Sequence, residues 1–422
     1  MNFKQTSLGD NIGFSTVVDE KFKTCSLFIR FFTELQPDKA PANSLASNCI
    51  AASNRDLPSI ALMNEKLSSL YGASISSYST ARGDLQIINF SSSWIHDRFA
   101  LENEPITAEM LKIISGCIFS QNASGGAFSE DIFKISKKEL LDSIDSELND
   151  KRTYINIKAE QLAFRGEPAA NRITGTKEQV NSLTASDAYN AYLNILRTAR
   201  IEIFYVAPEE DPDVAETFRK AFENIKREPE ELTFNTPSPL KETPETVTEE
   251  MDVNQCKIAL CFKSDSDDIY ALKLVNNIFG GTVVSRLFVN VREKMSLCYY
   301  CISTFNVPKN SFIVESGVEK ANIKKTCDEI LRQLDDIKNG NISDSELEQT
   351  LLILDNSLSS IGNTPSSYFS WFNSCICNGK MITPEQASEL YHSITKERLV
   401  EAARSIKLDS MYYMVNKESE NE

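Results

Sequence analysis

Histidine is almost absent from this chain, and its scarcity argues against the commonest forms of proton-transfer chemistry. The 422 residues contain two histidines, His96 and His392, which are far apart in the sequence. His96 follows Trp94 and Ile95 in a strand-like run, which favours a strand-end or core histidine over a catalytic base. No Gly-x-Ser-x-Gly run is present, and neither histidine has a recognisable nucleophile or orienting acid beside it.

Long apolar runs and an excess of basic charge are also lacking. No window reaches transmembrane length, and the first residues contain no apolar run typical of a signal peptide, so we expect a cytoplasmic protein without a membrane anchor. The net charge of -16 argues against nucleic acid and anionic membranes as partners, because both require a basic face. The apolar content of 41% and the charged content of 25% are typical of a globular protein.

The ten cysteines are scattered along the chain, so we expect them to be reduced and mostly buried. Cys298 and Cys301 have the spacing of half a zinc site, but no second pair follows at the spacing of a zinc finger. On a strand these two side chains would face opposite ways, which favours core filling over metal binding. Cys375 and Cys377 could share one strand face, but they lack companion ligands.

An acidic, proline-rich stretch divides the chain. Residues 228–250 contain four prolines, seven acids and one lysine. Such a composition does not pack a core, so it predicts a linker. We therefore predict two domains, residues 1–227 and residues 251–422, separated by this linker.

The two predicted domains repeat one order of elements, which indicates duplication. In each half an apolar strand precedes a helix that ends at a glycine, Gly72 or Gly280, consistent with a left-handed cap. In the first half the elements are a strand at residues 25–32, a strand pair at 73–93, helices at 108–119 and 129–148, and a closing strand at 201–206. In the second half they are a strand at 256–262, a strand pair at 298–318, helices at 322–338 and 343–360, and a closing strand at 411–415. This order predicts two tandem, homologous α+β domains, each a mostly antiparallel sheet flanked by helices.

The most specific motif lies in residues 280–300. It comprises Ser285-Arg-Leu-Phe288, Val291-Arg-Glu-Lys294 and Tyr299. Together with the tandem repeats, it resembles the M16 (insulinase, or mitochondrial-processing-peptidase-like) metallopeptidases over nearly the whole chain. The stretch is similar to the arginine/tyrosine substrate-binding motif of that family, formed here by Arg292 and Tyr299. Members of the small bacterial branch are often heterodimers, in which one subunit carries the zinc site and the other carries this pair.

The resemblance also identifies the chemistry that is missing. Peptidases of this family bind zinc through a helical His-x-x-Glu-His motif, in which the glutamate activates the metal-bound water. The resemblance places this motif within residues 44–52, so that Ser47, Ile50 and Ala51 replace the first histidine, the glutamate and the second histidine. None of these three side chains can bind zinc or move a proton.

A glutamate from a downstream helix completes the zinc site in the family. The resemblance places Ser143 at this position, and a shift of register would bring Glu139 or Asp142 there. One carboxylate without two imidazoles does not hold catalytic zinc. We therefore expect no metal and no cofactor in this chain, with zinc in its partner.

Arg292 and Tyr299 have groups suited to binding a peptide. The guanidinium of Arg292 can donate to peptide carbonyls or a carboxylate, and the Tyr299 hydroxyl can donate to a carbonyl oxygen as negative charge develops on it. A turn at residues 294–296 would bring both side chains to one surface. From composition alone, Arg292 would be a solvated charge on a helix and Tyr299 an aromatic side chain of a strand. The resemblance favours a functional role for both. Gly280 and Gly281 either cap a helix or leave the backbone bare for close approach of a chain.

These observations predict a non-catalytic M16-like subunit that is inactive alone. It would supply Arg292 and Tyr299 to a zinc-bearing paralogue in a heterodimer that binds and cleaves a peptide. One alternative is an inactive peptidase-like scaffold or peptide-binding protein, and a bacterial branch to which this chain is similar is associated with modification of elongation factor P. A further alternative is metal-dependent catalysis by this chain alone.

Overall fold

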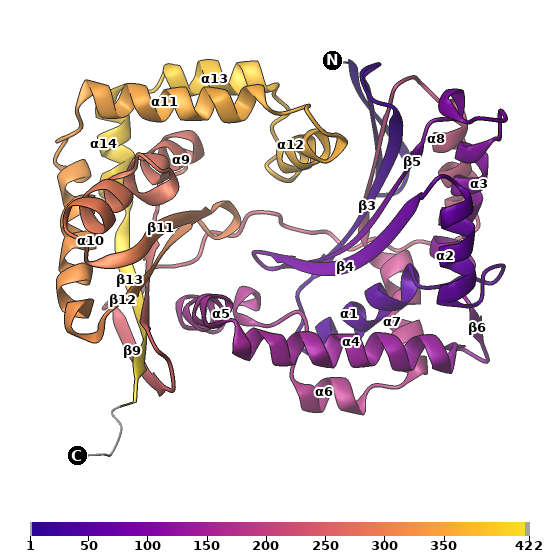
Figure 1. Ribbon diagram of the computed structural model, residues 1–422, viewed down its shortest axis with the longest axis horizontal. Helices are drawn as coiled ribbons and strands as arrows, with labels where there is room; N and C mark the ends of the chain where they lie inside the picture. Colours follow the sequence, from indigo (N-terminus) through magenta and orange to yellow (C-terminus); the bar gives the residue numbers. More distant parts are fainter. Residues whose placement is uncertain (1, 418–422) are drawn as a thin grey trace. The chain divides into compact units, whose positions relative to one another are not determined.

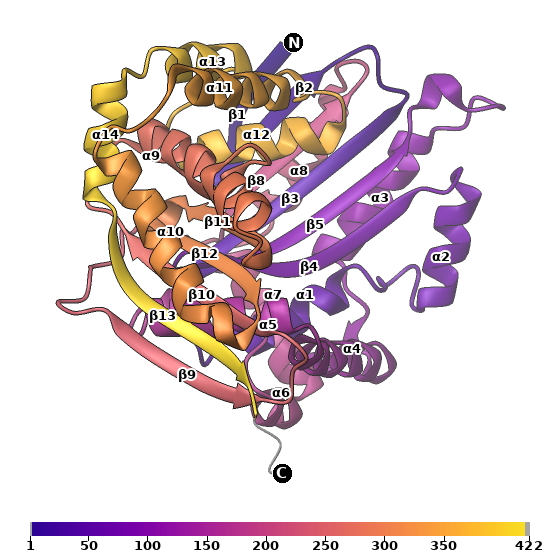
Figure 2. The ribbon, with the colours of Figure 1, turned by 60° about the vertical axis from the view of Figure 1, so that its left-hand side comes forward.

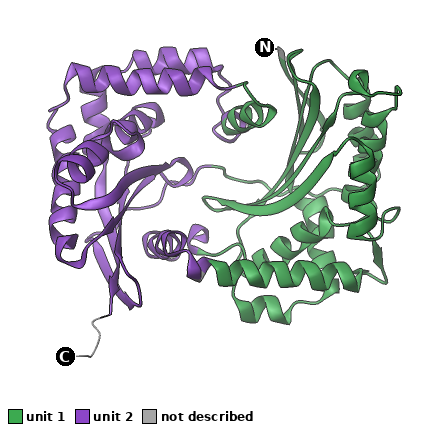
Figure 3. Ribbon diagram, viewed as in Figure 1, with its two compact units in different colours: residues 1–146, 171–234, 362–374 green, residues 147–170, 235–361, 375–422 purple. Residues whose placement is uncertain are grey.

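The computed structural model describes residues 2–417, which divide into two compact units (Figure 3). Unit 1 contains the residues up to 146 together with 171–234 and 362–374. Unit 2 contains residues 147–170 and 235–361 and those from 375 onward. Each unit is therefore built mainly from one half of the chain and includes a segment of the other half.

Unit 1 is organised around a six-stranded sheet with the strand order β1-β2-β8-β3-β5-β4 (Figure 1). Strands β2 and β8 are parallel, and the other neighbouring strands are antiparallel. The strands are β1 (Asn2–Gly9), β2 (Ile12–Val18), β3 (Thr24–Glu34), β4 (Ser74–Arg82), β5 (Leu85–Ile95) and β8 (Arg200–Ala207), with a short hairpin of β6 (Ala123–Ser124) and β7 (Ala127–Phe128). Strand β4 is one edge of the sheet.

Both faces of the unit 1 sheet are covered with apolar side chains. Leu27 of β3 points to the main core, which the sheet forms with helices of this unit. On the opposite face Phe369 of α12 (Pro365–Cys377) stacks on Phe28, with 4.3 Å between ring centroids, and Phe204 packs edge-on to Phe369 at 5.2 Å. The other helices are α1 (Ala40–Ile50), α2 (Ile60–Ser69), α3 (Ile106–Phe119), α4 (Glu130–Asn149), α6 (Lys177–Ser182), α7 (Ala185–Thr198) and α8 (Pro212–Glu223).

Unit 2 repeats this plan with a five-stranded sheet in the order β11-β12-β10-β13-β9. Its strands are β9 (Glu245–Met251), β10 (Cys256–Lys263), β11 (Cys298–Asn306), β12 (Ser311–Val318) and β13 (Lys407–Asn416). Ile155 and Ala159 of α5 pack with Cys261 of β10 on one face, whereas Phe262 meets Phe279 on the other. The helices are α5 (Lys151–Ala163), α9 (Ile269–Asn276), α10 (Ile323–Lys338), α11 (Asp344–Ser359), α13 (Pro384–His392) and α14 (Lys396–Ser405).

Ion pairs hold α5 on the unit 2 sheet. Glu315 of β12 is 5% exposed and accepts hydrogen bonds from Arg152 Nε at 2.7 Å and from Asn156 Nδ2 at 2.8 Å. Further along, Lys309 Nζ is 2.7 Å from a carboxylate oxygen of Glu167. These partners satisfy charges that would otherwise be costly to bury. They explain why a helix from the first half of the chain belongs to unit 2.

The predicted fold class is confirmed. The order β2-β8-β3-β5-β4 in unit 1 matches β9-β13-β10-β12-β11 in unit 2, with one parallel pair at the same place in each. Both sheets are mostly antiparallel and both are flanked by helices, as the repeat in the sequence predicts. Helices α5 and α12 hold equivalent places in the repeat, and each lies largely in the unit formed by the other half.

The segment predicted to be a linker, residues 228–250, is more structured than its composition suggests. Its last residues begin β9, which pairs in parallel with β13 at the edge of the unit 2 sheet (Figure 2). Along this strand Glu245 and Glu249 are half-buried and Glu250 is exposed. An edge strand tolerates such charge, because one of its faces is solvated.

Among the described residues, no helix combines the length and the apolar character needed to span a bilayer.

A substitution of Phe369 tests the assignment of α12 to unit 1. Phe369→Ala removes a buried ring that contacts Phe28 and Phe204, so we expect the free energy of unfolding to fall by about 3 kcal/mol. Ser370 lies next to it on the exposed side of the same helix, and Ser370→Ala should change the value by less than about 0.5 kcal/mol. Urea denaturation measures both. Equal effects of the two substitutions would contradict the packing described.

Candidate functional site

The positions assigned to the zinc motif lie on α1, packed against the unit 1 sheet. Ser47 is fully buried, and its hydroxyl oxygen is 3.1 Å from the hydroxyl oxygen of Ser77 on β4. Ile50 is buried in the main core, and Ala51 is the residue at which the helix ends. Cys49 is also buried here, and burial raises the pKa of its thiol to about 12. This helix contributes packing and holds none of the groups that bind zinc.

The position assigned to the last zinc ligand lies on α4. Ser143 is exposed, and its hydroxyl donates to the carbonyl oxygen of Leu140 in the same helix at 2.8 Å. The side chains of α4 that act on Cys49 of α1 are Ser136, through a hydrogen bond, and Glu139, through its charge. Glu139 is therefore a carboxylate of α4 close to α1.

A zinc ion does not fit this set of residues. Ser47 is already paired with Ser77, Ile50 and Ala51 have no donor atoms in their side chains, and a single carboxylate is insufficient. Within residues 2–417, no group of three or more histidine, cysteine, aspartate or glutamate side chains is arranged to hold a metal ion.

The two histidines have structural partners. His96 is 8% exposed at the end of β5, where its Nε2 is 3.1 Å from Glu209 and its Nδ1 accepts from the backbone N–H of Arg98. The interpretation of His96 as a strand-end histidine is confirmed. His392 pairs with Asp355 at 2.8 Å near the end of α13.

Arg292 lies in a segment that contains two π-helical stretches. These are η3 (Asn277–Gly281), which continues α9, and η4 (Leu287–Lys294). The backbone N–H of Met295 donates to the carbonyl oxygen of Asn290, five residues earlier, at 3.1 Å. Ser296 then adopts φ +49°, so a turn forms close to the place predicted and leads into β11. Wide turns of this kind are frequent at functional sites.

Tyr299 occupies a β-bulge at the start of β11. Cys298 pairs with Val318 of β12 and Tyr300 pairs with Gly317, so Tyr299 is the extra residue on its strand. Its side chain is 69% exposed. A bulge re-aims a side chain away from the regular alternation of a strand, and here it turns the phenol toward solvent.

Arg292 lies near the end of η4 and is half-exposed. Its guanidinium lies over the ring of Phe288, 4.6 Å from the centroid, and its NH1 is 3.3 Å from a carboxylate oxygen of its neighbour Glu293. Its positive charge also acts on the thiol of Cys298, the residue before Tyr299. Arg292 and Tyr299 are therefore both accessible and lie on either side of the same turn.

The cap predicted at Gly280 is wrong, whereas the one at Gly72 is confirmed. Helix α2 ends at Ser69, and Tyr71 with φ +59° and Gly72 with φ +73° then adopt the left-handed conformation of a C-terminal cap. Gly280 lies inside η3, where a Cβ atom would be 2.7 Å from Leu287 Cδ1 and 2.8 Å from the backbone nitrogen of Ser303. The bare backbone of Gly280 therefore accommodates β11 of this same chain.

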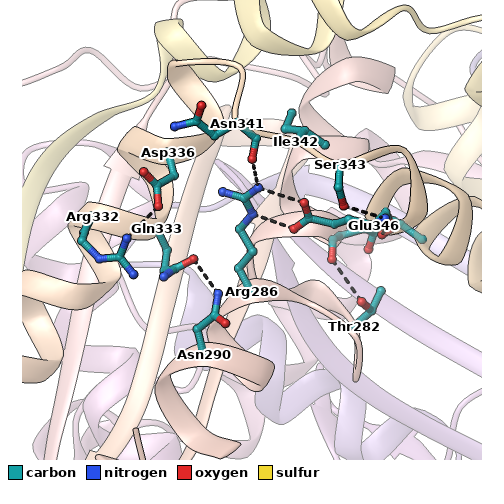
Figure 4. Close-up of polar contacts among 12 residues, drawn as sticks. Thr282, Arg286, Asn290, Arg332, Gln333, Asp336, Asn341, Ile342, Ser343 and Glu346 are labelled. Atoms are coloured by element: carbon teal, nitrogen blue, oxygen red, sulfur yellow. Dashed lines mark hydrogen bonds and ion pairs between the residues drawn. The ribbon is translucent and has the colours of Figure 1, made fainter. Parts of the chain in front are cut away.

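Arg286 anchors the segment to α11 (Figure 4). Its side chain is 9% exposed, and its Nε and NH2 donate to the two carboxylate oxygens of Glu346 on α11 at 2.6 and 2.8 Å. The same NH2 donates to the carbonyl oxygen of Asn341. This paired geometry is the most specific that an arginine and a carboxylate can form. Arg286 lies within the sequence motif, but the motif does not indicate its partner, which is 60 positions away.

The expectation that Cys298 and Cys301 face opposite ways is wrong. The bulge at Tyr299 adds one residue, so Cys298 and Cys301 oppose Val318 and Ser316, which lie on one face of β12. Each thiol shifts the pKa of the other, so the two sulfurs lie close together. No sequence pattern indicates this bulge.

The comparisons with known proteins agree with this architecture. Residues 182–354, which include Arg292 and Tyr299, match the family described as "Peptidase M16 inactive domain". The chain is therefore similar to M16 inactive-peptidase domains over these residues. It is also similar to "Probable inactive metalloprotease YmfF" of Bacillus subtilis (strain 168), with 26% identity over 402 residues, which cover 94% of each protein.

Three solved structures share the fold of this chain. A conserved protein from Enterococcus faecalis V583 has a TM-score of 0.91 at 24% identity, with 100% of each chain covered. A protease from Helicobacter pylori has a TM-score of 0.81 at 15% identity, covering 98% of this chain and 99% of that one. A peptidase M16 inactive domain from Pseudomonas fluorescens has a TM-score of 0.82 at 14% identity, with 100% of each chain covered. The tandem α+β architecture is thus shared over the full chain.

The pair of Arg286 and Glu346 can be tested by its contribution to stability. Arg286→Ala leaves Glu346 without its buried partner, so we expect the free energy of unfolding to fall by about 3 kcal/mol. Arg332 is 57% exposed and pairs with Glu329 of α10, which keeps its hydrogen bond from Gln333 when Arg332 is removed, so Arg332→Ala should cost less than about 1 kcal/mol. Chemical denaturation of both variants is the measurement. A loss for Arg286→Ala no larger than that of Arg332→Ala would show that the paired geometry is not an anchor.

Proposed function

We propose that this M16 homologue is the non-catalytic subunit of a heterodimeric zinc peptidase. In this proposal Arg292 and Tyr299 hold the substrate peptide for a zinc-bearing partner, and the chain alone is inactive. The observation that carries it is the contrast between the two units. The side chains at the metal-motif positions on α1 cannot bind a metal and are packed against the sheet. Arg292 and Tyr299, in contrast, are accessible on one turn of unit 2.

The two side chains suit complementary tasks. The guanidinium of Arg292 is half-exposed and has donors for the carbonyl oxygens or the terminal carboxylate of an extended peptide. The phenol of Tyr299 is exposed and can donate to the carbonyl oxygen that becomes negative during hydrolysis. Arg286 and Glu346 support this role because they fix the helix on which Arg292 lies.

Substitution of the pair within the mixed complex tests the proposal. We expect Arg292→Ala to lower kcat/KM on the order of tenfold to a hundredfold, since a charge-assisted hydrogen bond contributes about 1.5–3 kcal/mol. Tyr299→Phe should lower kcat by a comparable factor, because it removes a donor to the developing charge. The measurement is cleavage of a peptide by the chain mixed with a paralogue that carries His-x-x-Glu-His.

Two controls accompany this assay. Arg332→Ala removes an exposed cation of α10 and should leave turnover unchanged, and size-exclusion chromatography should show intact assembly for every variant. Normal turnover by both Arg292→Ala and Tyr299→Phe would rule out the assigned roles.

A second function is favoured by the exposed edge of unit 1. Strand β4 ends its sheet, and its residues alternate between exposed and half-buried positions. A free edge can add a peptide as a further strand. The chain would then be a peptide-binding scaffold without a proteolytic partner, a role connected in this proposal with modification of elongation factor P. Peptide binding by the isolated chain that Arg292→Ala and Tyr299→Phe leave unchanged would favour this function.

The proposed location is the cytoplasm. All ten cysteines are free, and nine of them are buried. Scattered reduced thiols of this kind are typical of a reducing compartment.

A further inference from the structure

The two thiols at the start of β11 are juxtaposed by a single extra residue. Ser316 and Val318 lie two positions apart on β12 and therefore point to one face of the sheet. Their partners on β11 are Cys301 and Cys298, because Tyr299 is the inserted residue. On a strand without the bulge, three positions would have placed the two sulfurs on opposite faces.

The two thiols differ in access to solvent. Cys301 is fully buried, whereas Cys298 is half-buried. The hydrogen bond from the Cys301 thiol lowers the pKa of Cys298 to about 7, with Ser316 and the charge of Arg292 acting in the same direction and burial opposing them. The same hydrogen bond and burial raise the pKa of Cys301. Cys298 is thus the sulfur that ionises first, and Cys301 retains its proton.

The remaining cysteines have different surroundings. Cys298 is the one cysteine of the described chain that is not buried. Burial raises the pKa of Cys25, Cys49, Cys117 and Cys261 to about 12, which makes these thiols inert. The reactivity expected at Cys298 therefore depends on its place beside Cys301 and Arg292.

We propose that Cys298 and Cys301 form a redox-active dithiol that low-molecular-weight disulfides oxidise, with Cys298 as the attacking sulfur and Cys301 as the resolving sulfur. The isolated chain can carry out this chemistry, which is separate from its proposed role in a heterodimer. It assigns a modification site to the surface that carries Arg292 and Tyr299.

The exchange proceeds in two steps that balance. The Cys298 thiolate attacks one sulfur of the small disulfide RSSR, a mixed disulfide forms, and RS⁻ leaves and takes up a proton. Cys301 then loses its proton, and its sulfur attacks the sulfur of Cys298. The protein disulfide forms as the second RS⁻ leaves and is protonated. Overall, two protein thiols are oxidised to one disulfide and one RSSR is reduced to two RSH.

Peptide mapping of the full chain tests this proposal. Trypsin cleavage after Lys294 and Lys309 releases residues 295–309, in which the only cysteines are Cys298 and Cys301. After treatment with oxidised glutathione and alkylation of free thiols, we expect this peptide without alkyl groups and lighter than its reduced form by two hydrogens. Dithiothreitol should restore the reduced form.

Two variants separate the roles of the sulfurs. Cys301→Ser should retain a glutathione adduct on Cys298, and Cys298→Ser should give neither adduct nor disulfide in this peptide. The matched control, Cys375→Ser, removes a buried thiol of α12 and should leave the oxidation unchanged.

The rate of alkylation at neutral pH gives an independent readout. Cys298 should react at least about tenfold faster than Cys117 or Cys261, because a thiolate that solvent reaches is the reacting species. Two free thiols in residues 295–309 of the wild-type chain after oxidation would overturn the proposal. So would a folded Cys301→Ser variant that carries no adduct.

Discussion

The packing of α1 against the unit 1 sheet limits what that unit can do. The helix buries Leu45, Ala46 and Ile50 in the main core, and Ser47 faces Ser77 on β4 without contact with solvent. In an M16 peptidase, the face of such a helix would have to present imidazoles and a carboxylate to a metal ion. Here it presents small and apolar groups that fill the space.

The proposed function depends on two exposed side chains of unit 2. Arg292 and Tyr299 are held on either side of one turn, and Tyr299 reaches solvent because a bulge interrupts β11. Arg286 and Glu346 fix η4, the helix on which Arg292 lies, and Gly280 lets the backbone of η3 approach β11 closely. Buried and well-partnered residues thus support two exposed side chains, which is the arrangement expected of a binding site rather than of solvated surface charge.

Much of the fold could be predicted because both halves of the sequence repeat one order of patterns. The apolar run of β10 and the periodicity of α3 and α10 depend on local contrast between apolar and polar residues. Strand β9 was missed because an edge strand that carries three glutamates has the composition of a linker. The places of α5 and α12 depend on contacts such as Arg152 with Glu315, which are too far apart in sequence for periodicity to indicate.

The candidate site could likewise be predicted only in part from the sequence. Arg292 and Tyr299 could be named from their motif, and the turn between them follows from the change of helix to strand. The bulge could not be predicted, because one inserted residue leaves no mark on composition or alternation. The juxtaposition of Cys298 and Cys301 and the outward direction of Tyr299 both depend on that residue.

We propose that the metal and the arginine/tyrosine pair reside on different chains. The most direct test is the zinc content of the purified full chain after equilibration with zinc and removal of unbound metal, measured by inductively coupled plasma mass spectrometry. We expect far less than one zinc ion per chain, together with no cleavage of peptides by the chain alone. One tightly held zinc ion per chain, accompanied by peptide cleavage that a chelator abolishes, would contradict it.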